Sequence, residues 1–400
     1  MAKSRENDIT ILLGLKGCNI GEIWEEGDRV IVEVGIKGRQ KCAYCGSRRL
    51  YKHGRCKPRE VLHSWSRGRR IYLRLERGRW KCRDCGRTFS EGRELVRPYS
   101  RLTRQAEGEA LRQLKDRNFS QIKRELGIGY RTLRGLLERE GCCEALEFLG
   151  DRDEIYLGID EHSFRQRELV YSVTEVKERR MLGILRDERI DTLKRFLRKI
   201  PTDKVKEVCI DMKWGLRKAV EALFPRARVV VDPFHVIADA NKRMDEARRI
   251  EQEVHPRKVR IPKKIFLVGR ERLSEDKRRK LDGLLQKYPC LKGFYWAKEK
   301  ICQLYRQKSR EDASRLLDNI ILNLKSDDDA ELVRWGNTLK RWRDPILNHF
   351  YNYTTNAFTE GCHTKIKMLK RTSFGLRNVE VYRRKMLLGF LPSIPCFHTV

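Results

Sequence analysis

Apolar and polar residues alternate from Arg69 to Glu76, and this two-residue period predicts a β-strand. From Leu102 to Lys115 the apolar residues recur at helical intervals instead. After Gly150 the pattern changes again, to short apolar runs separated by amphipathic stretches. The sequence therefore predicts an N-terminal segment with strands, then a helical segment, then a segment that mixes strands and helices.

The mixed segment contains five apolar runs that we expect to be strands and two amphipathic stretches that we expect to be helices. The expected strands are 154–162, 169–176, 181–185, 205–211 and 227–232, and the expected helices are 190–200, which Pro201 stops, and 215–224. Strands that alternate with crossover helices form a mixed α/β sheet. The first three strands predict a meander at one side of that sheet.

Residues 118–134 have the pattern of two short helices joined by a glycine turn. Ser120 is the expected N-cap of the first helix, and Leu126-Gly127-Ile128 is the expected turn. Tyr130, Arg131, Thr132 and Arg134 would then open a second helix. This pattern is typical of a DNA-binding helix-turn-helix, although a plain helical hairpin is compatible with the same residues.

The segment from about residue 240 to 340 is charged and helical, with little strand character. We expect it to be a helical insertion whose aromatic residues lie mostly in its core, namely Tyr295, Trp296, Tyr305, Trp335 and Trp342. The polar residues 352–356 could begin a final helix. Along that helix Glu360, His363 and Lys367 are three and then four residues apart, so they share one face.

The charge of the chain points to a polyanionic partner. The 400 residues include 89 Lys and Arg against 56 Asp and Glu, a net charge of +33. Residues 36–93 alone carry 19 basic and 4 acidic side chains, a net of +15, and Arg69 and Arg70 are candidate DNA contacts there. A basic face that only binds water would have the same composition.

Apolar runs are short throughout the chain, and none approaches the ~18 residues of a membrane span. The first ten residues are polar and charged where a secretion signal requires an apolar run. We therefore expect a soluble cytoplasmic protein that does not associate with a membrane.

Two identical C-x-x-C-G motifs predict a metal site. Cys42 and Cys45 form the first pair, and Cys82 and Cys85 form the second. Four thiolates at this spacing favour a tetrahedral structural zinc, although accidental turns or a redox dithiol are the alternatives. His53 and Cys56 are weaker candidate ligands. The other cysteines read as core residues (Cys18, Cys209, Cys290, Cys302 and Cys396) or as helix-end residues (Cys142 and Cys143).

Acidic residues follow three of the expected strands. Asp160, Asp211 and Asp232 each stand at the end of an apolar run. In an open α/β sheet the ends of adjacent strands meet at one edge, so these three carboxylates could lie close together there. Two such carboxylates with a third acid can hold paired Mg²⁺ ions for phosphodiester chemistry. Glu360 is the candidate third acid, and Lys367 could meet a phosphate. Each Asp could instead be an ordinary turn or N-cap residue.

Five segments together resemble the insertion-sequence transposases of the ISL3 family. These segments are GIDE at 158–161, DM at 211–212, VDPFHV at 231–236, TNAFTEG at 355–361 and IKMLKRTSFGLRN at 366–378. The resemblance covers almost the whole chain, in the expected order. One departure is Cys362-His363-Thr364, which stand where the family usually shows a pair of Asn residues.

The resemblance implies a DDE transposase with a ribonuclease-H-like core that a helical insertion interrupts before the last acid. It assigns Asp160, Asp211 and Glu360 as the acidic triad, and Asp232 and His235 as a D-x-x-H element near the site. The expected reaction is two-metal phosphoryl transfer with Mg²⁺ or Mn²⁺, in which Asp160 contacts both ions. His363 lies beside this triad on the same predicted helix.

The expected fold class is thus multidomain α+β. Its segments are a zinc ribbon (1–95), a helix-turn-helix (96–150), the first part of a ribonuclease-H-like core (151–239), an all-α insertion (240–345) and the rest of the core (346–400). The expected partners are double-stranded DNA at the element ends and the target, and a second copy of the chain. A catalytically inactive DNA-binding regulator and a structure-specific nuclease are the alternative functions.

Overall fold

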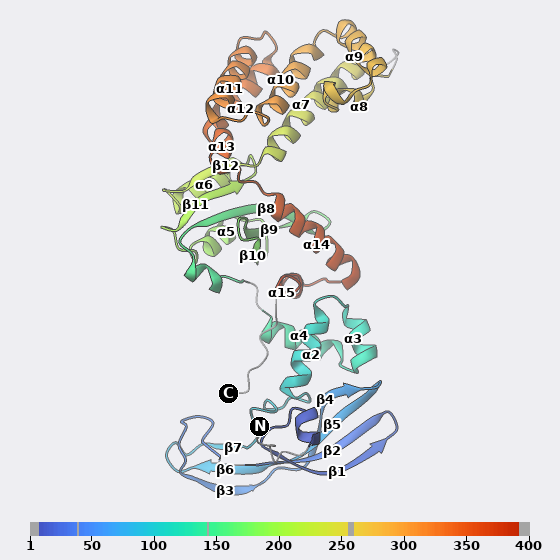
Figure 1. The fold of residues 1–400 in the computed structure, drawn as a ribbon, viewed down its shortest axis with the longest axis vertical. Helices are drawn as coiled ribbons and strands as arrows, with labels where there is room; N and C mark the ends of the chain where they lie inside the picture. Colours follow the sequence, from blue (N-terminus) through green and yellow to red (C-terminus); the bar gives the residue numbers. More distant parts are fainter. Residues whose placement is uncertain (1–7, 38–39, 142–143, 255–259, 392–400) are drawn as a thin grey trace. The chain divides into compact units, whose positions relative to one another are not determined.

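The computed structural model describes residues 8–37, 40–141, 144–254 and 260–391 (Figure 1). The chain divides into two compact units, and each is described by itself. One unit comprises Met1–Cys142 with Leu369–Val400, and the other comprises Cys143–Met368. The predicted segments 1–95, 151–239 and 240–345 each fall within one unit, whereas 96–150 and 346–400 are each divided between both. The finer domain boundaries stay a prediction.

The first unit contains a four-stranded sheet. Its strands lie in the order β1 (Cys18–Glu26), β2 (Arg29–Ile36), β5 (Arg69–Glu76) and β4 (Arg59–Ser66). Strand β5 has the predicted bounds, and its alternation is confirmed because Leu73 and Leu75 are buried while Arg74 and Glu76 are exposed. The buried side chains of this sheet form a small core of their own, joined by Val96 and Leu15.

A second, three-stranded sheet in this unit bears the cysteine motifs. It consists of β3 (Leu50–Arg55), β6 (Gly78–Cys82) and β7 (Thr88–Ser90), in that order. Each C-x-x-C-G motif forms a tight turn beside this sheet. Gly46 and Gly86 take φ values of +73° and +67°, so these positions favour glycine.

The first unit also contains helices that pack together. They are α2 (Arg104–Leu114), α3 (Phe119–Leu126), α4 (Tyr130–Glu140) and α15 (Val379–Leu388), and a short helix α1 (Asp8–Leu12) precedes the first sheet. Leu111, Ile122, Leu133 and Val381 meet in their shared apolar core. Gly127, with a φ of +73°, ends α3 as predicted. The DNA-binding role predicted for α3 and α4 stays a prediction.

The predicted N-cap of α3 was wrong. Asn118, not Ser120, caps the helix: the Asn118 side chain accepts a hydrogen bond from the Gln121 N–H at 2.8 Å. The Gln121 side chain accepts one from the Asn118 N–H at 3.1 Å, which completes a capping box. Ser120 lies within the first turn and is exposed. The glutamine at the third helical position of α3 makes this reciprocal cap possible.

The second unit is built on a five-stranded sheet. Its order is β10 (Arg180–Ile184), β9 (Glu168–Glu175), β8 (Ile155–Arg165), β11 (Val205–Ile210) and β12 (Arg228–Val231). The first three strands are antiparallel, and β8, β11 and β12 are parallel. Helices α5 (Ile190–Leu197) and α6 (Trp214–Leu223) connect strands, and a 3-10 turn (Glu147–Asp151) precedes β8. The predicted meander and mixed sheet are confirmed.

Helices make up most of the rest of this unit, and α7 to α12 cluster together (Figure 1). They are α7 (Pro233–Val254), α8 (Lys263–Leu267), α9 (Glu275–Lys287), α10 (Leu291–Leu304), α11 (Arg310–Lys325) and α12 (Ala330–Leu347), with a 3-10 turn at Arg270–Arg272. Their predicted aromatic core is confirmed: Tyr295, Trp335 and Trp342 are buried, and Trp296 and Tyr305 pack against the same cluster. Helix α7 begins directly after β12.

Two further helices follow the cluster, α13 (His349–Asn352) and α14 (Ala357–Ser373). Helix α14 is the predicted helix that carries Glu360, His363 and Lys367, but the prediction that it is the final helix was wrong, because α15 follows it. Helix α14 begins in the second unit and ends in the first.

The cysteines that were expected in the core differ in their burial. Cys18 and Cys209 are buried and Cys302 is half-buried, as expected of core residues, but Cys290 is exposed, so its assignment to the core was wrong. Cys142, Cys143 and Cys396 lie outside the described residues.

Within the part of the chain that the structure describes, no helix combines the length and the apolar character needed to cross a membrane.

The capping box of α3 gives a first prediction. Replacing Asn118 by Ala should lower the protection of the α3 amides by about 1 kcal/mol, roughly five-fold in hydrogen exchange, because the Gln121 N–H loses its side-chain acceptor. Mass spectrometry of deuterium uptake in the full chain would measure this loss. Ser120→Ala is the matched control and should leave the exchange unchanged. Equal effects of the two substitutions would contradict the assignment.

Candidate active site

Strand register brings three carboxylates to one edge of the five-stranded sheet. Gly158 of β8 pairs with Cys209 of β11, so Asp160 and Asp211 each lie two residues farther along neighbouring parallel strands. Ile210 pairs with Val231, which sets Asp211 level with Asp232 on the next strand. The Asp232 N–H donates to the Ile210 carbonyl at 3.1 Å. Asp160, Asp211 and Asp232 are therefore level on three adjacent strands.

Helix α14 adds Glu360 to this edge of the sheet. Asn356, just before the helix, donates its backbone N–H to Asp232 Oδ1 at 3.2 Å and its side-chain amide to the Ile159 carbonyl at 3.1 Å. The Glu360 N–H in turn donates to the Asn356 carbonyl at 2.8 Å. The first turn of α14 is thus tied to β8 and to Asp232, and Glu360 projects from that turn.

A glycine allows this close approach. A Cβ atom at Gly158 would lie 2.6 Å from Thr359 Oγ1 and 2.7 Å from Asn356 Oδ1, well inside van der Waals contact. Thr359 Oγ1 also lies 2.7 Å from Thr174 Oγ1 of β9, within hydrogen-bond distance. No local sequence pattern pointed to Thr174, Thr359 or Asn356 as residues of the site. Asn356 and Thr359 do lie in the segment 355–361, which resembles the ISL3 family, so that resemblance contained a signal for these two residues. It contained none for Thr174.

The acidic side chains form two overlapping groups with the spacing of metal ligands. Asp160, Asp211 and His235 offer ligand atoms that all lie within 4.8 Å of one another, and so do Asp232, His235 and Glu360. His235, in the first turn of α7, belongs to both groups. Its Nε2 atom lies 2.7 Å from Asp211 Oδ1. The structure thus brings together all three predicted triad acids, and Asp232 and His235 with them.

Burial disfavours the charged form of these acids. Asp160, Asp211 and Asp232 are each less than a tenth exposed. Burial, reinforced by the nearby charge of Asp211, raises the pKa of Asp160 to about 7. Burial likewise raises the pKa of Asp232 to about 6. Burial lowers the pKa of the His235 ring, but its hydrogen bond to Asp211 outweighs this and the net pKa is raised.

The side chains present fit a hard divalent cation. Four carboxylates supply the oxygen ligands that Mg²⁺ and Mn²⁺ prefer. Asp232 Oδ2 is buried and has no hydrogen-bond partner among the described residues. A buried carboxylate oxygen without a partner is costly unless an ion or water meets it. A cation here would also relieve the repulsion that raises the Asp160 pKa.

Two histidines lie beside Asp160. His363 Nδ1 is 3.4 Å from Asp160 Oδ2, and the His363 ring centroid is 4.7 Å from that of His162. His162 Nδ1 lies 2.9 Å from the Ser172 hydroxyl. Burial, helped by the charge of Lys367, lowers the pKa of His363 to about 4. Lys367 itself is exposed. No sequence pattern pointed to His162 as a residue of the site.

The four predicted cysteines also come together. Cys42 Sγ lies 3.5 Å from Cys85 Sγ, and Cys45 Sγ lies 3.7 Å from Cys82 Sγ. Sulfur atoms around a tetrahedral zinc with bonds of about 2.3 Å are about 3.8 Å apart, so the cluster fits that ion. Neither of the two weaker candidate ligands, His53 and Cys56, belongs to this four-residue group.

The predicted DNA contacts are accessible to different degrees. Tyr130, Arg131 and Thr132 are exposed at the start of α4, and Arg134 pairs with Glu138 at 2.7 Å. In β5, Arg69 pairs with Glu25, and Arg70 pairs with Asp28 at 3.3 Å. All six residues lie in the first unit.

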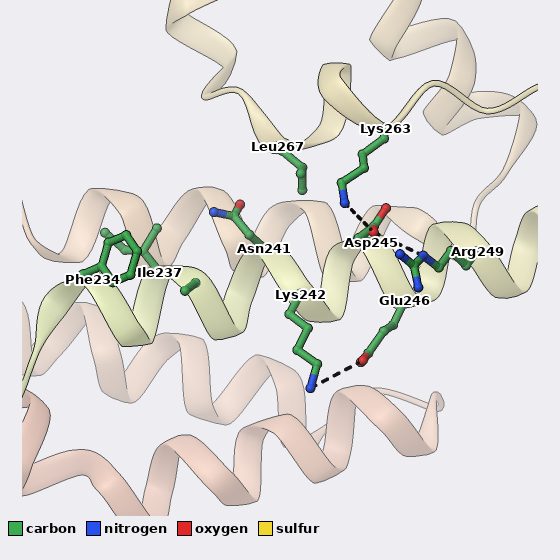
Figure 2. A pocket seen from close by; sticks show the side chains of 10 residues that line it. Phe234, Ile237, Asn241, Lys242, Asp245, Glu246, Arg249, Lys263 and Leu267 are labelled. Atoms are coloured by element: carbon green, nitrogen blue, oxygen red, sulfur yellow. Dashed lines mark ion pairs between the residues drawn. The ribbon is translucent and has the colours of Figure 1, made fainter. Parts of the chain in front are cut away.

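A cavity of about 500 Å³ lies along α7, close to His235 in sequence (Figure 2). Phe234 lines one end of it. The buried Asp245 carboxylate contacts Lys263 at 2.9 Å and Arg249 at 3.3 Å, as the dashed lines in Figure 2 show. Only Asp245 and Glu246 are acidic in this lining, and both are paired with cations. This cavity therefore lacks the converging carboxylates of the strand edge.

Residues 157–386 match the family model DDE_Tnp_ISL3, described as a transposase, and the match covers more than half of the chain. The chain belongs to the ISL3 family of insertion-sequence DDE transposases. The predicted resemblance is thereby confirmed. The chain is also similar to the transposase for insertion sequence element IS1001 of Bordetella parapertussis, with 23% identity over 392 residues. That alignment spans 94% of this chain and 96% of the relative.

Membership of this family makes the protein a DNA-processing transposase with DNA as its partner, and it implies the use of divalent metal ions. The acidic strand edge described above lies within the matched residues.

The raised Asp160 pKa predicts how pH affects stability without metal. Between about pH 4 and 7 the unfolded chain has lost the Asp160 proton while the folded protein retains it, so stability falls as pH rises. Asp160→Asn removes this effect. In EDTA the variant should be about 2–4 kcal/mol more stable than the parent at pH 8, with the difference vanishing near pH 4.

Urea denaturation of the full chain at both pH values would measure the difference. The exposed Asp203 gives a matched control, because Asp203→Asn removes a carboxylate from the same unit without removing a buried charge. A difference between parent and Asp160→Asn that is the same at pH 4 and pH 8 would show that the carboxylate does not titrate as stated.

Proposed function

We propose that the protein binds the terminal inverted repeats of its insertion sequence, cleaves the element ends and joins their 3′-hydroxyls to target DNA. The observation that carries this proposal is the convergence of Asp160, Asp211, Asp232 and Glu360 at one sheet edge, with His235 between them. Phosphodiester transfer needs closely spaced hard ligands, and this edge supplies them. We further propose that this sheet with α14 is a ribonuclease-H-like core.

Bound magnesium or manganese ions would activate the attacking oxygen and stabilise the charge of the leaving oxygen. Asp160, Asp211 and Glu360 are the residues that would hold these ions. Asp232 shares a ligand group with Glu360, so it is the fourth candidate ligand.

Three basic side chains have separate proposed roles at this edge. His235 orients the Asp211 carboxylate through the 2.7 Å contact of its Nε2 atom. Lys367 is exposed on α14, two turns beyond Glu360, and could neutralise a DNA phosphate near the site. His363 lies against Asp160 Oδ2 and limits the positions that this carboxylate can take.

The first unit is the proposed DNA-binding part of the protein. We propose that α3 and α4 act as a helix-turn-helix in which Tyr130, Arg131, Thr132 and Arg134 face the DNA. The basic segment 36–93, with Arg69 and Arg70, would contact phosphates and position the element end. Because two ends must be paired, we propose that a dimer or higher oligomer acts on DNA.

We also propose that Cys42, Cys45, Cys82 and Cys85 hold one structural zinc ion. The three-stranded sheet that carries them has a very small apolar core, formed by Phe89, Leu50 and Trp80 with the cysteines. Such a small core cannot stabilise a sheet alone, so a metal ion would supply much of the folding free energy.

Loss of a single site acid should abolish the reaction. Asp160→Asn and Glu360→Gln should each lower the amount of joined product by on the order of 1,000-fold or more, because metal ligation contributes several kcal/mol to the transition state. The assay incubates the protein with Mg²⁺, a labelled duplex carrying the terminal repeats, and a target plasmid. Binding of the labelled duplex should be retained in both variants.

Asp203→Asn, a surface change in the same unit, is the control and should join ends as the parent does. Each rival function gives its own result in this assay. A DNA-binding regulator would bind the ends without cutting them, and a structure-specific nuclease would cut branched DNA without joining it. Normal joining by Asp160→Asn would contradict the proposed mechanism directly.

The zinc proposal predicts one zinc ion per chain. Cys42→Ser and Cys82→Ser should each lose this ion and increase hydrogen exchange across β3, β6 and β7, whereas Cys56→Ser should keep both the ion and the protection. Elemental analysis of the purified protein measures the stoichiometry. A Cys56→Ser variant that also loses zinc, or a parent without zinc, would rule out the assigned ligand set.

A further inference from the structure

A groove in the first unit lies between the start of α3, the first residue of α4 and the loop that joins α14 to α15. We call it the Phe374 groove. Its volume is about 670 Å³, and its lining consists of Asn118, Phe119, Ser120, Lys123, Arg124 and Tyr130 with residues 373–376. All of these residues belong to the first unit. The proposed acidic site lies in the other unit and shares no residue with the groove.

The charge of the groove is wholly positive. Lys123 and Arg124 are its only charged lining residues, and no carboxylate lines it. Both cations are exposed, and neither makes an ion pair with any residue in the described ranges. Arg371 and Arg377, on either side of the loop, are exposed as well. Cations without acidic neighbours are complementary to a polyanion.

The groove also has an aromatic wall. Phe119 is buried at its base, and its ring centroid lies 5.0 Å from that of Tyr130. Tyr130 is 51% exposed and Phe374 is 75% exposed. Aromatic faces beside cations are the combination that proteins use to contact nucleotide bases and sugars while pairing with phosphates.

The loop holds Phe374 outward against ordinary conformational preference. Phe374 and Gly375 have φ values of +39° and +65°, and a left-handed conformation is unfavourable for a phenylalanine. The loop is anchored just after Phe374: Leu376 packs against the core of the helices, and Asn378 accepts hydrogen bonds from the first turn of α15. The exposed ring gains no burial that would offset its backbone conformation. A bound ligand would provide that burial.

We propose that the Phe374 groove receives one strand of the DNA duplex that α4 reads. In this arrangement Lys123 and Arg124 contact phosphates, and the Phe374 ring contacts sugars or base edges from the minor groove. Apolar side chains held in this way are used to wedge against base steps. The inference rests on the proposed helix-turn-helix function and extends it to a loop that the sequence analysis did not connect with DNA.

The test measures the affinity of the full-length, zinc-loaded protein for a fluorescent duplex carrying the terminal repeat. Fluorescence anisotropy is recorded in EDTA-free buffer without Mg²⁺, at several salt concentrations. Phe374→Ala should raise Kd about 10-fold, because a stacking or wedging aromatic is lost. Lys123→Gln with Arg124→Gln should also weaken binding and should reduce the slope of log K against log salt by about 1 to 2.

Tyr99 provides a matched control in the same unit. It is 97% exposed and also has a positive φ, +61°, but it does not line the groove. Tyr99→Ala should bind the duplex as the parent does. Phe374→Trp should retain the affinity because the aromatic face is kept. Thermal unfolding of each variant should match the parent, since both rings are exposed.

Arg131→Ala separates this inference from the proposed function, because Arg131 lies on α4 but not in the groove lining. If Arg131→Ala weakens binding and Phe374→Ala does not, the groove inference is overturned and the helix-turn-helix stands. If neither substitution weakens binding, both fail. If Phe374→Ala changes self-association in sedimentation without changing DNA affinity, the groove is a protein interface and the inference is overturned.

Discussion

Repulsion among buried carboxylates is the constraint on which the rest of the second unit depends. The parallel register of β8, β11 and β12 sets three aspartates level on adjacent strands, where water cannot screen them. Burial, reinforced by the charges of neighbouring acids, raises the pKa values of Asp160 and Asp232, and these shifts express the cost of this arrangement. Replacing any one of these acids by a neutral residue would lower the free energy of the folded protein, so the acids are not there for stability. Their convergence is therefore the strongest physical argument for a cation-dependent reaction.

The same constraint explains why the helix that carries Glu360 is held so firmly. A fourth negative charge would be driven away from three others unless its backbone were fixed. The hydrogen bonds of Asn356 to Asp232 and to the Ile159 carbonyl fix it, and the missing Cβ atom of Gly158 makes room for them. Packing at one glycine and one asparagine thus positions an acid that comes from a distant part of the chain.

Much of the fold could be predicted from the sequence because its signals are local. Alternation at Arg69–Glu76 and the apolar runs of the mixed sheet gave the strands nearly at their observed bounds. Local signals failed at the start of α3, because both Asn118 and Ser120 are residue types that cap helices well. The reciprocal hydrogen bond of the Gln121 side chain favours Asn118 as the cap. Cys290 failed for a different reason, because exposure depends on tertiary packing.

The site could be predicted only in outline. Strand-end acids and the resemblance to the ISL3 family identified Asp160, Asp211 and Glu360, but the division into two ligand groups requires strand order and helix docking. Neither is encoded in a local pattern, because β8 and β11 are separated in sequence by two strands and a helix. The Phe374 groove shows the same limit, since it joins residues near 120 to residues near 374.

The balance between the charges of the four acids and the proposed cations explains why His363 can lie beside the acids. Asp160, Asp211, Asp232 and Glu360 together carry four negative charges when ionised, and two divalent cations under the proposed mechanism would neutralise them. A protonated histidine would add a positive charge and compete with the cations. The pKa of His363 is lowered to about 4, chiefly by burial, so its ring is neutral at physiological pH. The neutral ring can contact Asp160 without changing that charge balance. The side-chain amide of an Asn, the residue that the family usually shows in this segment, would be neutral in the same way.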